Sequence, residues 1–344
     1  MITLSQLPGR TTIINNEEYL FFSGYSYLGL GLNEEFIALV KEGIDKYAVV
    51  YPSSRISNTP LDLYTEFEAK LAKHTEAAAV ACFSSGFLSA RTATEVVRNQ
   101  MQVYCLHHTH PASSAHPGIT PIPAEQGWND FLLEREQQNE FRFGLVADSI
   151  NPTPGHINDF SFLNNTPSHF NITLIIDDSH GIGWMGDLGE GILSTLILPS
   201  NIELLLNFSL SKAYHINGGA ICGSQKWIDE VRQHVNYATS TPMMPSLAYA
   251  WLHGDKLFSR QRTSLQQNIQ HLQKLTVNDT FVANEGTPIF VADKKGIATH
   301  LLRNKVIISS FGYPHPESDP VNRIVLNALH TISDLEKLAL LIGH

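Results

Sequence analysis

Apolar residues near the start of the chain recur at the spacing of an amphipathic helix. Asn33 is a residue type that caps helix N-termini, and Thr59-Pro60 is a second helix start signal. We therefore expect one helix to follow Asn33 and another to follow Thr59-Pro60. The apolar faces would consist of Phe36, Val40, Ile44 and Tyr47 in the first helix, and of Leu63, Phe67 and Leu71 in the second.

Short apolar runs alternate with helical stretches from about residue 79 to residue 224. This alternation is typical of a mainly parallel sheet covered by helices. The runs are AVACF, VYCL, GLVAD, LIIDD, LLLNFS and GAICGS. Polar residues follow several runs at their carboxyl side, which is the edge where open α/β sheets bind ligands. We expect one site to gather these residues, which are Ser85, His110, Asp177, His180 and Ser209.

The pattern changes after about residue 246. A long helical stretch comes first, followed by the short apolar segments FVAN, PIFVAD, VIISSF and NRIVLNAL. A helix is expected near residues 297–303, and Thr331 can cap a closing helix. This part of the chain therefore predicts a smaller α+β unit. No internal repeat, low-complexity tract or long linker marks a boundary.

Composition narrows the classes of partner. Lys and Arg total 23 against 33 Asp and Glu, for a net charge of -10 over 344 residues, without a basic cluster to follow a phosphate backbone. Nucleic acid is therefore not expected as a partner. Hydrophobic residues make up 43% of the chain and charged residues only 16%, which favours an oligomer because other protein can cover part of the surface.

Cysteine usage and the N-terminal sequence indicate the compartment. The chain has three cysteines, Cys82, Cys105 and Cys222, with no CxxC spacing. This set argues against a disulfide framework and a zinc ribbon, and it favours a reducing compartment. MITLSQLPGRTT lacks the pattern of a signal peptide, and no apolar run is long enough to span a membrane. We expect a cytoplasmic protein without membrane partners.

Two segments carry most of the candidate chemistry. In LIIDDSHGIGWMGDLGEG, an expected buried strand is followed by two carboxylates, a histidine and a Gly-rich turn. In NFSLSKAYHINGGAICGS, Lys212 follows an apolar strand inside a Ser-rich stretch. A lysine at this place is either a surface cation or an amine held near a strand end to form a Schiff base.

The order of carboxylate, histidine and lysine resembles that of fold type I pyridoxal phosphate enzymes, most closely the α-oxoamine synthases. The resemblance extends from YLGL at 27–30 to ALHT at 328–331. It implies an α/β fold like that of aspartate aminotransferase, with a large, mainly parallel-sheet domain at residues 40–245. Residues 1–39 and 246–344 would form a small α+β domain. Several motifs in the same order make the match more specific than any single motif.

The resemblance assigns the central roles in the cofactor site. Lys212 would form the Schiff base with pyridoxal phosphate, and its amine would then move the Cα proton of the substrate. Asp177 would face the pyridine nitrogen, because an anion there keeps that nitrogen protonated. His180 would hydrogen-bond the cofactor's phenolic oxygen, the alternative being a turn histidine that caps its own loop. Asp178 would be structural.

A histidine-rich segment, VYCLHHTHPASSAH, aligns His110 with the family histidine that stacks on the pyridine ring. A shift in register would move this role to His107, His108 or His116. The crowding also raises the question of a metal site. Four histidines without a matching acid or cysteine pattern do not predict a zinc site, so no metal is expected.

Phosphate binding is expected where a strand, a small-residue turn and a helix start follow one another, because exposed N–H groups and the helix dipole favour anions there. Ser85-Gly86-Phe87 fits this description and resembles the family's SGF turn. The resemblance therefore assigns the amides of Gly86 and Phe87, and the Ser209 hydroxyl, to the phosphate. YATSTP resembles a segment donated across the dimer interface, which makes Thr239 a candidate phosphate ligand in a homodimer.

Substrate recognition is where the chain departs from the family. Arg323 in NRIVLNALHT matches the arginine that binds the substrate carboxylate, the alternative being a surface strand arginine. Tyr25 replaces an asparagine that helps to hold the same carboxylate. Pro152 lies where a hydroxyl is expected, and in Val49–Arg55 bulky residues and a proline replace a Gly-rich stretch. These changes indicate an altered or narrowed substrate.

The resemblance implies an acyltransferase that condenses an amino acid with an acyl thioester and releases carbon dioxide, as in 8-amino-7-oxononanoate synthesis. The acyl donor would be an acyl-CoA or an acyl carrier thioester. An aminotransferase or related lyase that uses Lys212, Asp177 and Arg323 without a thioester is the second hypothesis. A non-catalytic scaffold that keeps the fold is the third.

Overall fold

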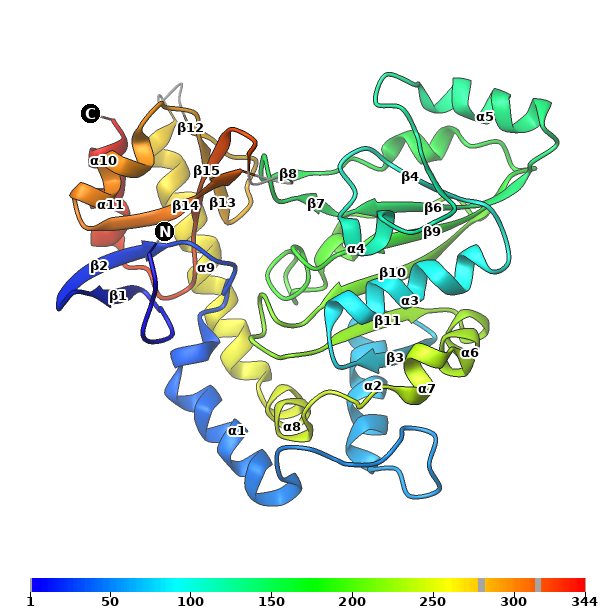
Figure 1. Cartoon of the computed structure of the whole chain (residues 1–344), viewed down its shortest axis with the longest axis horizontal. Helices are drawn as coiled ribbons and strands as arrows, with labels where there is room; N and C mark the ends of the chain where they lie inside the picture. Colours follow the sequence, from blue (N-terminus) through cyan, green and yellow to red (C-terminus); the bar gives the residue numbers. More distant parts are fainter. Residues whose placement is uncertain (1, 278–281, 313–316, 344) are drawn as a thin grey trace.

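The computed structural model describes residues 2–277, 282–312 and 317–343. A seven-stranded sheet forms the centre of the larger part of the molecule, in the order β3-β11-β10-β9-β6-β4-β5 (Figure 1). The strands β10, β9, β6, β4 and β5 are parallel to one another, and β11 is antiparallel to both of its neighbours. The predicted mainly parallel sheet is therefore confirmed. Its strands are β3 (Ala79–Phe83), β4 (Val103–Cys105), β5 (Ile119–Pro121), β6 (Arg142–Asp148), β9 (Asn171–Asp177), β10 (Ile202–Ser209) and β11 (Gly219–Gly223).

Helices cover both faces of this sheet, and alternate residues of a strand face opposite layers. On β10, Leu205 packs in the cluster that includes Trp227 of α6, whereas Leu206 packs in the cluster that includes Phe67 of α2. The helices of this part are α2 (Asp62–His74), α3 (Gly86–Arg98), α4 (Pro111–Ser114), α5 (Trp128–Gln137), α6 (Gln225–Gln233) and α7 (Val235–Thr239). A short hairpin, β7 (Ile150–Asn151) and β8 (His156–Ile157), and the 3-10 turns η2 (Ser161–Asn165) and η3 (Gly191–Ser194) complete it.

A second sheet of six strands joins the two ends of the chain, in the order β1-β2-β14-β15-β13-β12. The N-terminal strand β2 pairs in parallel with β14, which follows it by almost 300 residues. Figure 1 shows both termini in this part of the molecule. The strands are β1 (Thr11–Ile14), β2 (Glu17–Phe22), β12 (Val282–Ala283), β13 (Ile289–Ala292), β14 (Val306–Gly312) and β15 (Pro320–Val325). The domain boundaries near residues 40 and 245 remain a proposal.

The remaining helices include those predicted near the ends of the chain. The Asn33 side chain accepts a hydrogen bond from the Phe36 amide, 3.1 Å away, at the start of α1. Thr331 and Asp334 form a reciprocal capping box at the start of α11, so the expected cap is present. These helices are η1 (Leu30–Leu32), α1 (Glu34–Tyr47), α8 (Pro245–His253), α9 (Asp255–Thr276), α10 (Ile297–Arg303) and α11 (Ile332–Ile342).

Two local predictions differ from the structure. The second helix begins at Asp62 and not at Thr59-Pro60, because the Thr59 carbonyl accepts a hydrogen bond from the Tyr51 hydroxyl and belongs to the preceding loop. In α1 the predicted apolar face is only partly covered, since Phe36 is buried while Ile44 is 37% exposed. The strand predicted from FVAN is seen at Val282–Ala283, and Phe281 lies outside the described residues.

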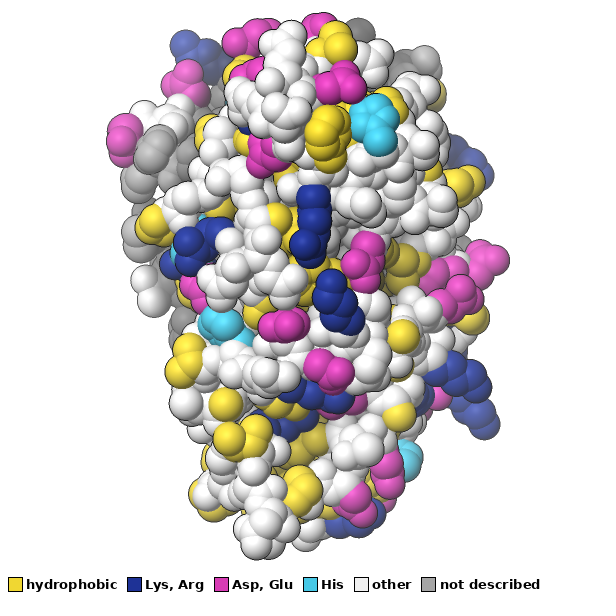
Figure 2. All heavy atoms as spheres, turned by 90° about the vertical axis from the view of Figure 1, so that its right-hand side faces the viewer, with side chains coloured by type: hydrophobic (Ala, Val, Ile, Leu, Met, Phe, Trp, Pro, Cys, Tyr) yellow, Lys and Arg dark blue, Asp and Glu magenta, His cyan; other side chains and the backbone are white. Residues whose placement is uncertain are grey.

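Two observations concern the surface and the membrane. Figure 2 shows the face that lies on the right-hand side of Figure 1. On this face, Lys and Arg side chains lie among Asp and Glu side chains and do not form a continuous basic patch. Of the helices within the described ranges, none is long and apolar enough to cross a membrane.

Candidate active site

Most of the residues predicted for the site surround one cavity of about 200 Å³. It lies where β6, β9 and β10 end, because the carboxyl ends of parallel strands meet at one edge of a sheet. Asp148, the last residue of β6, and Pro152, four residues further along the chain, also line it. The predicted residues that line the cavity are Gly86, Phe87, His110, Asp177, His180, Ser209 and Lys212.

Lys212 lies in the turn that follows β10. It lines the cavity, and its amine makes no hydrogen bond or ion pair with the described residues. Burial lowers the pKa of this amine, and the charges of Asp177, Asp148 and Asp178 oppose that effect. The lowered pKa increases the fraction of unprotonated amine, which is the form that reacts as a nucleophile or accepts a proton.

Asp177 is the last residue of β9, and its carboxylate is held from two sides. One oxygen accepts the Ser179 amide at 3.0 Å, and the other accepts the Asn207 side-chain amide at 3.1 Å. Asn207 lies opposite Asp177 on the adjacent strand β10. These contacts fix the orientation of an anion at the cavity wall.

Asp178 is fully buried beneath the site and does not line the cavity. Its Oδ2 accepts the Ile192 amide at 3.0 Å, which ties the end of β9 to η3. Burial raises the pKa of this carboxyl to about 7. A Cβ on Gly191 would lie 1.8 Å from Asp178 Oδ2, so glycine is required there for the chain to pass the carboxylate.

His180 is enclosed by aromatic side chains. Its Nδ1 lies 2.8 Å from the hydroxyl of Tyr27, and its carbonyl accepts a hydrogen bond from the Trp184 indole. The ring of Tyr25 meets the His180 ring edge-on, with centroids 4.8 Å apart. Burial, followed by the charges of Lys212, His110 and Arg323, holds the pKa of His180 well below its usual value. A neutral imidazole is therefore favoured.

The N-terminus of α3 supplies hydrogen-bond donors. Ser85 caps the helix by accepting the Leu88 amide at 3.2 Å. The amides of Gly86 and Phe87, as the first two of the helix, have no acceptor within it. A Cβ on Gly86 would lie 2.3 Å from Cβ of Ser209, so only glycine allows the helix start to approach the hydroxyl this closely. The arrangement suits an anion such as a phosphate.

His110 and Asp148 form a contact that the sequence analysis did not predict. Both carboxylate oxygens of Asp148 accept the His110 amide, at 3.0 and 3.2 Å, and Nδ1 of His110 accepts the Ala112 amide at 3.1 Å. The sequence does contain a signal for Asp148 as a site residue: it ends the apolar run GLVAD, just as Asp177 ends its own strand. His116, an alternative for the same role, is 2.7 Å from Glu95 and does not line the cavity.

Arg323 lies on β15 and is only 2% exposed. One terminal nitrogen donates to the Pro152 carbonyl at 3.3 Å, while its Nε and Nη2 are buried without a hydrogen-bond partner in the described residues. The guanidinium also lies 5.9 Å from the Tyr25 ring centroid. It is therefore not the surface arginine of the alternative interpretation. An anionic ligand could accept hydrogen bonds from these two buried donors.

Thr239 does not line this cavity. It ends α7, its hydroxyl donates to the Val235 carbonyl at 2.8 Å, and its side chain is exposed. The predicted role of Thr239 requires a second subunit and stays a prediction. Within the described ranges, no three or more His, Cys, Asp and Glu residues are grouped to hold a metal ion.

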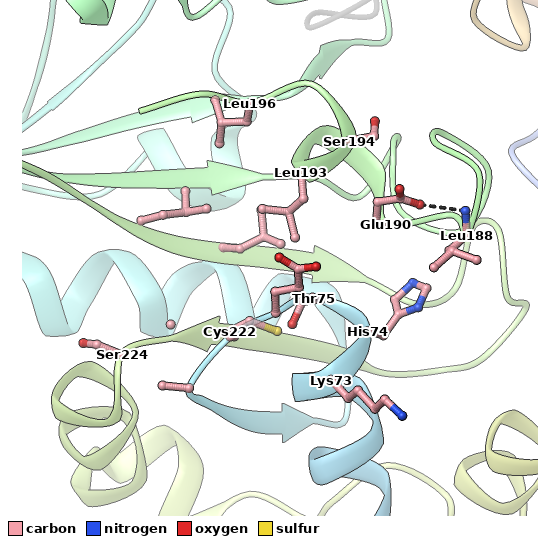
Figure 3. A pocket seen from close by; sticks show the side chains of 16 residues that line it. Lys73, His74, Thr75, Leu188, Glu190, Leu193, Ser194, Leu196, Cys222 and Ser224 are labelled. Carbon is pink, nitrogen blue, oxygen red and sulfur yellow. Dashed lines mark hydrogen bonds between the residues drawn. The ribbon is translucent and has the colours of Figure 1, made fainter. Parts of the chain in front are cut away.

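A larger cavity of about 660 Å³ lies elsewhere, between the end of α2 and η3. Figure 3 shows Lys73 and His74 at the end of α2 and the hydrogen bond from the Leu188 amide to Glu190, which measures 2.8 Å. None of the residues predicted for the site lines this cavity. The candidate chemistry is therefore concentrated in the smaller one.

The donor set of the smaller cavity fits pyridoxal phosphate. The amides of Gly86 and Phe87 can bind a phosphate, Asp177 can pair with a ring N–H, and the Lys212 amine can react with an aldehyde. The absence of a side chain at Gly86 lets the start of α3 lie against Ser209, so both can contact one phosphate. His180 offers a ring nitrogen to an oxygen of the same ligand.

Comparisons with known proteins agree with this assignment. Curated relatives include 8-amino-7-oxononanoate synthase of Thermosipho melanesiensis, 24% identical over 97% of this chain and 90% of the relative. The enzyme of the same name from Lysinibacillus sphaericus is 26% identical over 94% of this chain and 88% of the relative. These similarities confirm the predicted resemblance to α-oxoamine synthases.

Solved structures show the same fold. Serine palmitoyltransferase of Sphingomonas wittichii matches with a TM-score of 0.84 at 16% identity, covering 99% of this chain and 90% of that one. The 8-amino-7-oxononanoate synthase of Francisella tularensis matches with a TM-score of 0.73 at 22% identity, covering 94% and 97%. The predicted fold type I architecture is confirmed. A family model described as aminotransferase class I and II matches residues 147–342, more than half of the sequence, and the chain therefore belongs to this family of pyridoxal phosphate enzymes.

Proposed function

We propose that the protein is a pyridoxal phosphate-dependent acyltransferase that condenses an amino acid with an acyl thioester and releases carbon dioxide, as in 8-amino-7-oxononanoate synthesis. The observation that carries the proposal is the grouping of Lys212, Asp177 and His180 around one cavity, with Arg323 next to it. Similarity over nearly the whole chain to proteins named 8-amino-7-oxononanoate synthase supports the reaction.

Pyridoxal phosphate, when bound, withdraws electrons and so stabilises a carbanion at the α-carbon of the amino acid. Lys212 would hold the cofactor and move the proton at the substrate's α-carbon, and its lowered pKa favours the unprotonated amine. Asp177, fixed by Ser179 and Asn207, would accept the N–H of the pyridine ring. His110, which lines the same cavity, would stack on that ring.

The phosphate would be bound by the amides of Gly86 and Phe87 and by the hydroxyl of Ser209. Ser209 Oγ is 2.7 Å from Ser211 Oγ, so one of these two hydroxyls donates to the other. A phosphate near Ser209 would accept the remaining hydroxyl proton. Such charge-assisted hydrogen bonds are roughly twice as strong as those between neutral groups.

The substrate carboxylate would be bound by Arg323. Its two unpaired nitrogens match the two oxygens of a carboxylate, and ion pairing would remove the cost of leaving them buried without acceptors. Tyr25, whose ring lies near both Arg323 and His180, would shape the space around the substrate. Tyr25 stands where the family has a smaller asparagine, so less space would remain for the substrate side chain. This favours a small amino acid.

The assembly would be a homodimer, with Thr239 reaching the phosphate of the partner subunit. Exposed apolar residues lie in the loop that contacts the Thr239 segment: Val50 is 52% exposed and Ile56 67% exposed. Ser54 in this loop donates to the Ala238 carbonyl at 2.9 Å. The described cysteines are free and buried, which fits a reducing, cytoplasmic location.

The first experiment is the visible absorption spectrum of the purified protein with pyridoxal phosphate. Glycine, alanine and serine are then added separately, and Lys212→Ala is the control. A yellow band that wild type shows and Lys212→Ala lacks, and that shifts with one amino acid, would support the cofactor, the lysine and the substrate class together. Absence of a band in wild type would overturn the proposal.

The second experiment distinguishes acyl transfer from transamination. Transamination is the alternative because the matching family model is described as aminotransferase class I and II. The protein is incubated with the amino acid that shifts the spectrum, with and without an acyl-CoA. Release of thiol and carbon dioxide only when the thioester is present supports the acyltransferase. Formation of the 2-oxo acid without any thioester would instead identify an aminotransferase.

A further inference from the structure

We propose that Tyr27 is a positioning residue that fixes the tautomer of His180, so that Nε2 carries the proton and presents an N–H donor to the cavity. The Tyr27 side chain is fully buried, and its hydroxyl lies 2.8 Å from Nδ1 of His180. The proposal concerns the protein's own groups. Only its consequence for pyridoxal phosphate rests on the proposed function.

The charge state of the pair follows from its surroundings. Burial raises the pKa of Tyr27 well above its usual value, so the phenol keeps its proton. Burial and the positive charges of Lys212, His110 and Arg323 lower the pKa of His180 well below its usual value, so the imidazole is neutral. A neutral imidazole carries one proton, on either Nδ1 or Nε2.

Hydrogen-bond satisfaction decides between the two nitrogens. Among the described residues, the Tyr27 hydroxyl has a hydrogen bond only to His180. If Nδ1 carried the proton and donated it to Tyr27, the hydroxyl's own proton would therefore have no acceptor there. A buried O–H without an acceptor carries the full desolvation penalty. If Tyr27 donates to Nδ1, every donor of the pair has an acceptor or faces the cavity. The second arrangement is therefore favoured.

Nε2 is then the ring nitrogen that faces the ligand. His180 lines the cavity, and Nε2 is not one of the buried unpartnered atoms of the described residues. The imidazole is held in place by two contacts of the ring itself: its Nδ1 lies 2.8 Å from the Tyr27 hydroxyl, and the Tyr25 ring packs against it at an interplanar angle of 83°. Tyr27 itself packs against Trp184, with ring centroids 6.4 Å apart.

The tautomer determines the chemistry of His180. An Nε2–H group donates to an oxygen anion and cannot accept a proton at the same atom. His180 would thus stabilise negative charge on the cofactor's phenolic oxygen and would not serve as a general base. The role of base is left to Lys212.

The test uses the apoprotein labelled with ¹⁵N-histidine. Long-range ¹H–¹⁵N correlation spectra distinguish the two tautomers, and the signals of His180 are identified by their absence in His180→Gln. We expect Nε2 protonation in wild type at pH 7.5. Tyr27→Phe removes only the hydroxyl and should produce a mixture of tautomers.

Tyr64→Phe is the matched control. Tyr64 is also buried, and its hydroxyl donates to the Met243 carbonyl at 2.7 Å, away from His180. This variant should keep the wild-type tautomer. Near-ultraviolet circular dichroism of each variant shows whether the fold is retained, and the tautomer of wild type is informative even if Tyr27→Phe does not fold.

A second measurement is the dissociation constant for pyridoxal phosphate. It should rise about tenfold in Tyr27→Phe and stay within about twofold in Tyr64→Phe. Protonation of His180 at Nδ1 in wild type, or an unchanged tautomer in folded Tyr27→Phe, would overturn the proposal. If wild type does not bind pyridoxal phosphate, the proposed function fails, whereas the spectra of the apoprotein still decide the role of Tyr27.

Discussion

Asp148 and Asp177 lie opposite each other on the adjacent parallel strands β6 and β9, and both line the same cavity. Asp177 accepts two hydrogen bonds, from Ser179 and Asn207. Asp148 accepts the His110 amide, but burial and then the charge of Asp177 hold its pKa well above the usual value. Asp148 therefore takes up a proton more readily than an ordinary aspartate does.

Replacement of Asp148 tests this relationship. A carboxyl whose pKa is raised on folding destabilises the folded state at high pH. The reason is that the folded protein must then hold a charge that its surroundings disfavour. Asp148→Asn removes the charge and keeps an oxygen that can accept the His110 amide. We expect its free energy of unfolding to exceed that of wild type by about 1 kcal/mol at pH 8 and by less at pH 5.

The measurement is urea denaturation of the apoprotein at both pH values. Asp130→Asn, on α5 and away from the cavity, is the control and should show no such pH dependence. Equal stability differences at pH 5 and pH 8 would contradict the assignment of the raised pKa to Asp148.

Arg323→Lys tests carboxylate binding. Lysine keeps the positive charge but cannot form two parallel hydrogen bonds with a carboxylate. We expect KM for the amino acid to rise by about tenfold or more, with kcat changed much less. The exposed Arg303 on α10 gives the matched control, Arg303→Lys, which should behave like wild type. Unchanged KM in Arg323→Lys would rule out this arginine as the carboxylate ligand.

Gly86→Ala tests the phosphate site. The new methyl group would lie 2.3 Å from Cβ of Ser209, so the helix start and the end of β10 must move apart. Because both elements would bind the phosphate, the dissociation constant for pyridoxal phosphate should rise by at least about tenfold. Gly343→Ala, whose methyl group would meet only the Ala339 carbonyl at 3.6 Å, is the control. Equal affinity in the two variants would show that the α3 N-terminus does not bind the cofactor.

The buried environment of His330 leads us to expect that the protein loses stability in acid. Its Nδ1 accepts the Asn327 amide, its Nε2 donates to the Phe21 carbonyl, and its ring stacks on Phe22 with centroids 4.0 Å apart. Burial lowers its pKa to about 4. Since the pKa in the unfolded chain is about 6.5, the stabilisation is complete above that pH and is lost as the pH falls towards 4.

The expected contribution of His330 is about 2 kcal/mol of stability lost between pH 8 and pH 5. Urea denaturation of wild type and His330→Gln over this range measures it as the difference between their pH dependences. His300→Gln, on the exposed side of α10, should keep the wild-type pH dependence. If His330→Gln loses as much stability in acid as wild type does, the imidazole does not titrate as stated.

The sequence predicted the strands well because each is a continuous apolar run bounded by turn residues. The same pattern explains why polar residues at strand ends, such as Asp177 and Ser209, are found at one cavity: parallel strands bring their carboxyl ends together. Asp148 follows the same rule, because it ends the run GLVAD, but it was not among the strand-end residues predicted for the site.

Contacts between distant segments could not be predicted in this way. Tyr27 lies in the quoted motif YLGL, but its hydrogen bond joins it to a residue 153 positions away. The orphaned donors of Arg323 likewise depend on where the loop with Pro152 passes. No periodicity encodes such pairs, because they are set by how the small sheet packs beside the large one. The start of α2 was misplaced because Thr59 is engaged by Tyr51 in the preceding loop.

The parallel pairing of β2 with β14 has a consequence for the order of events during synthesis. The strand β2 leaves the ribosome early, but its partner is made almost 300 residues later. Until then β1 and β2 form at most an isolated hairpin, which is marginally stable in water. Local elements of the large sheet can form during translation, whereas the small sheet must wait for the chain to be completed. The Tyr27 carbonyl, five residues after β2, accepts the Ala328 amide at 2.9 Å, so this tie between the two ends of the chain also forms late in synthesis.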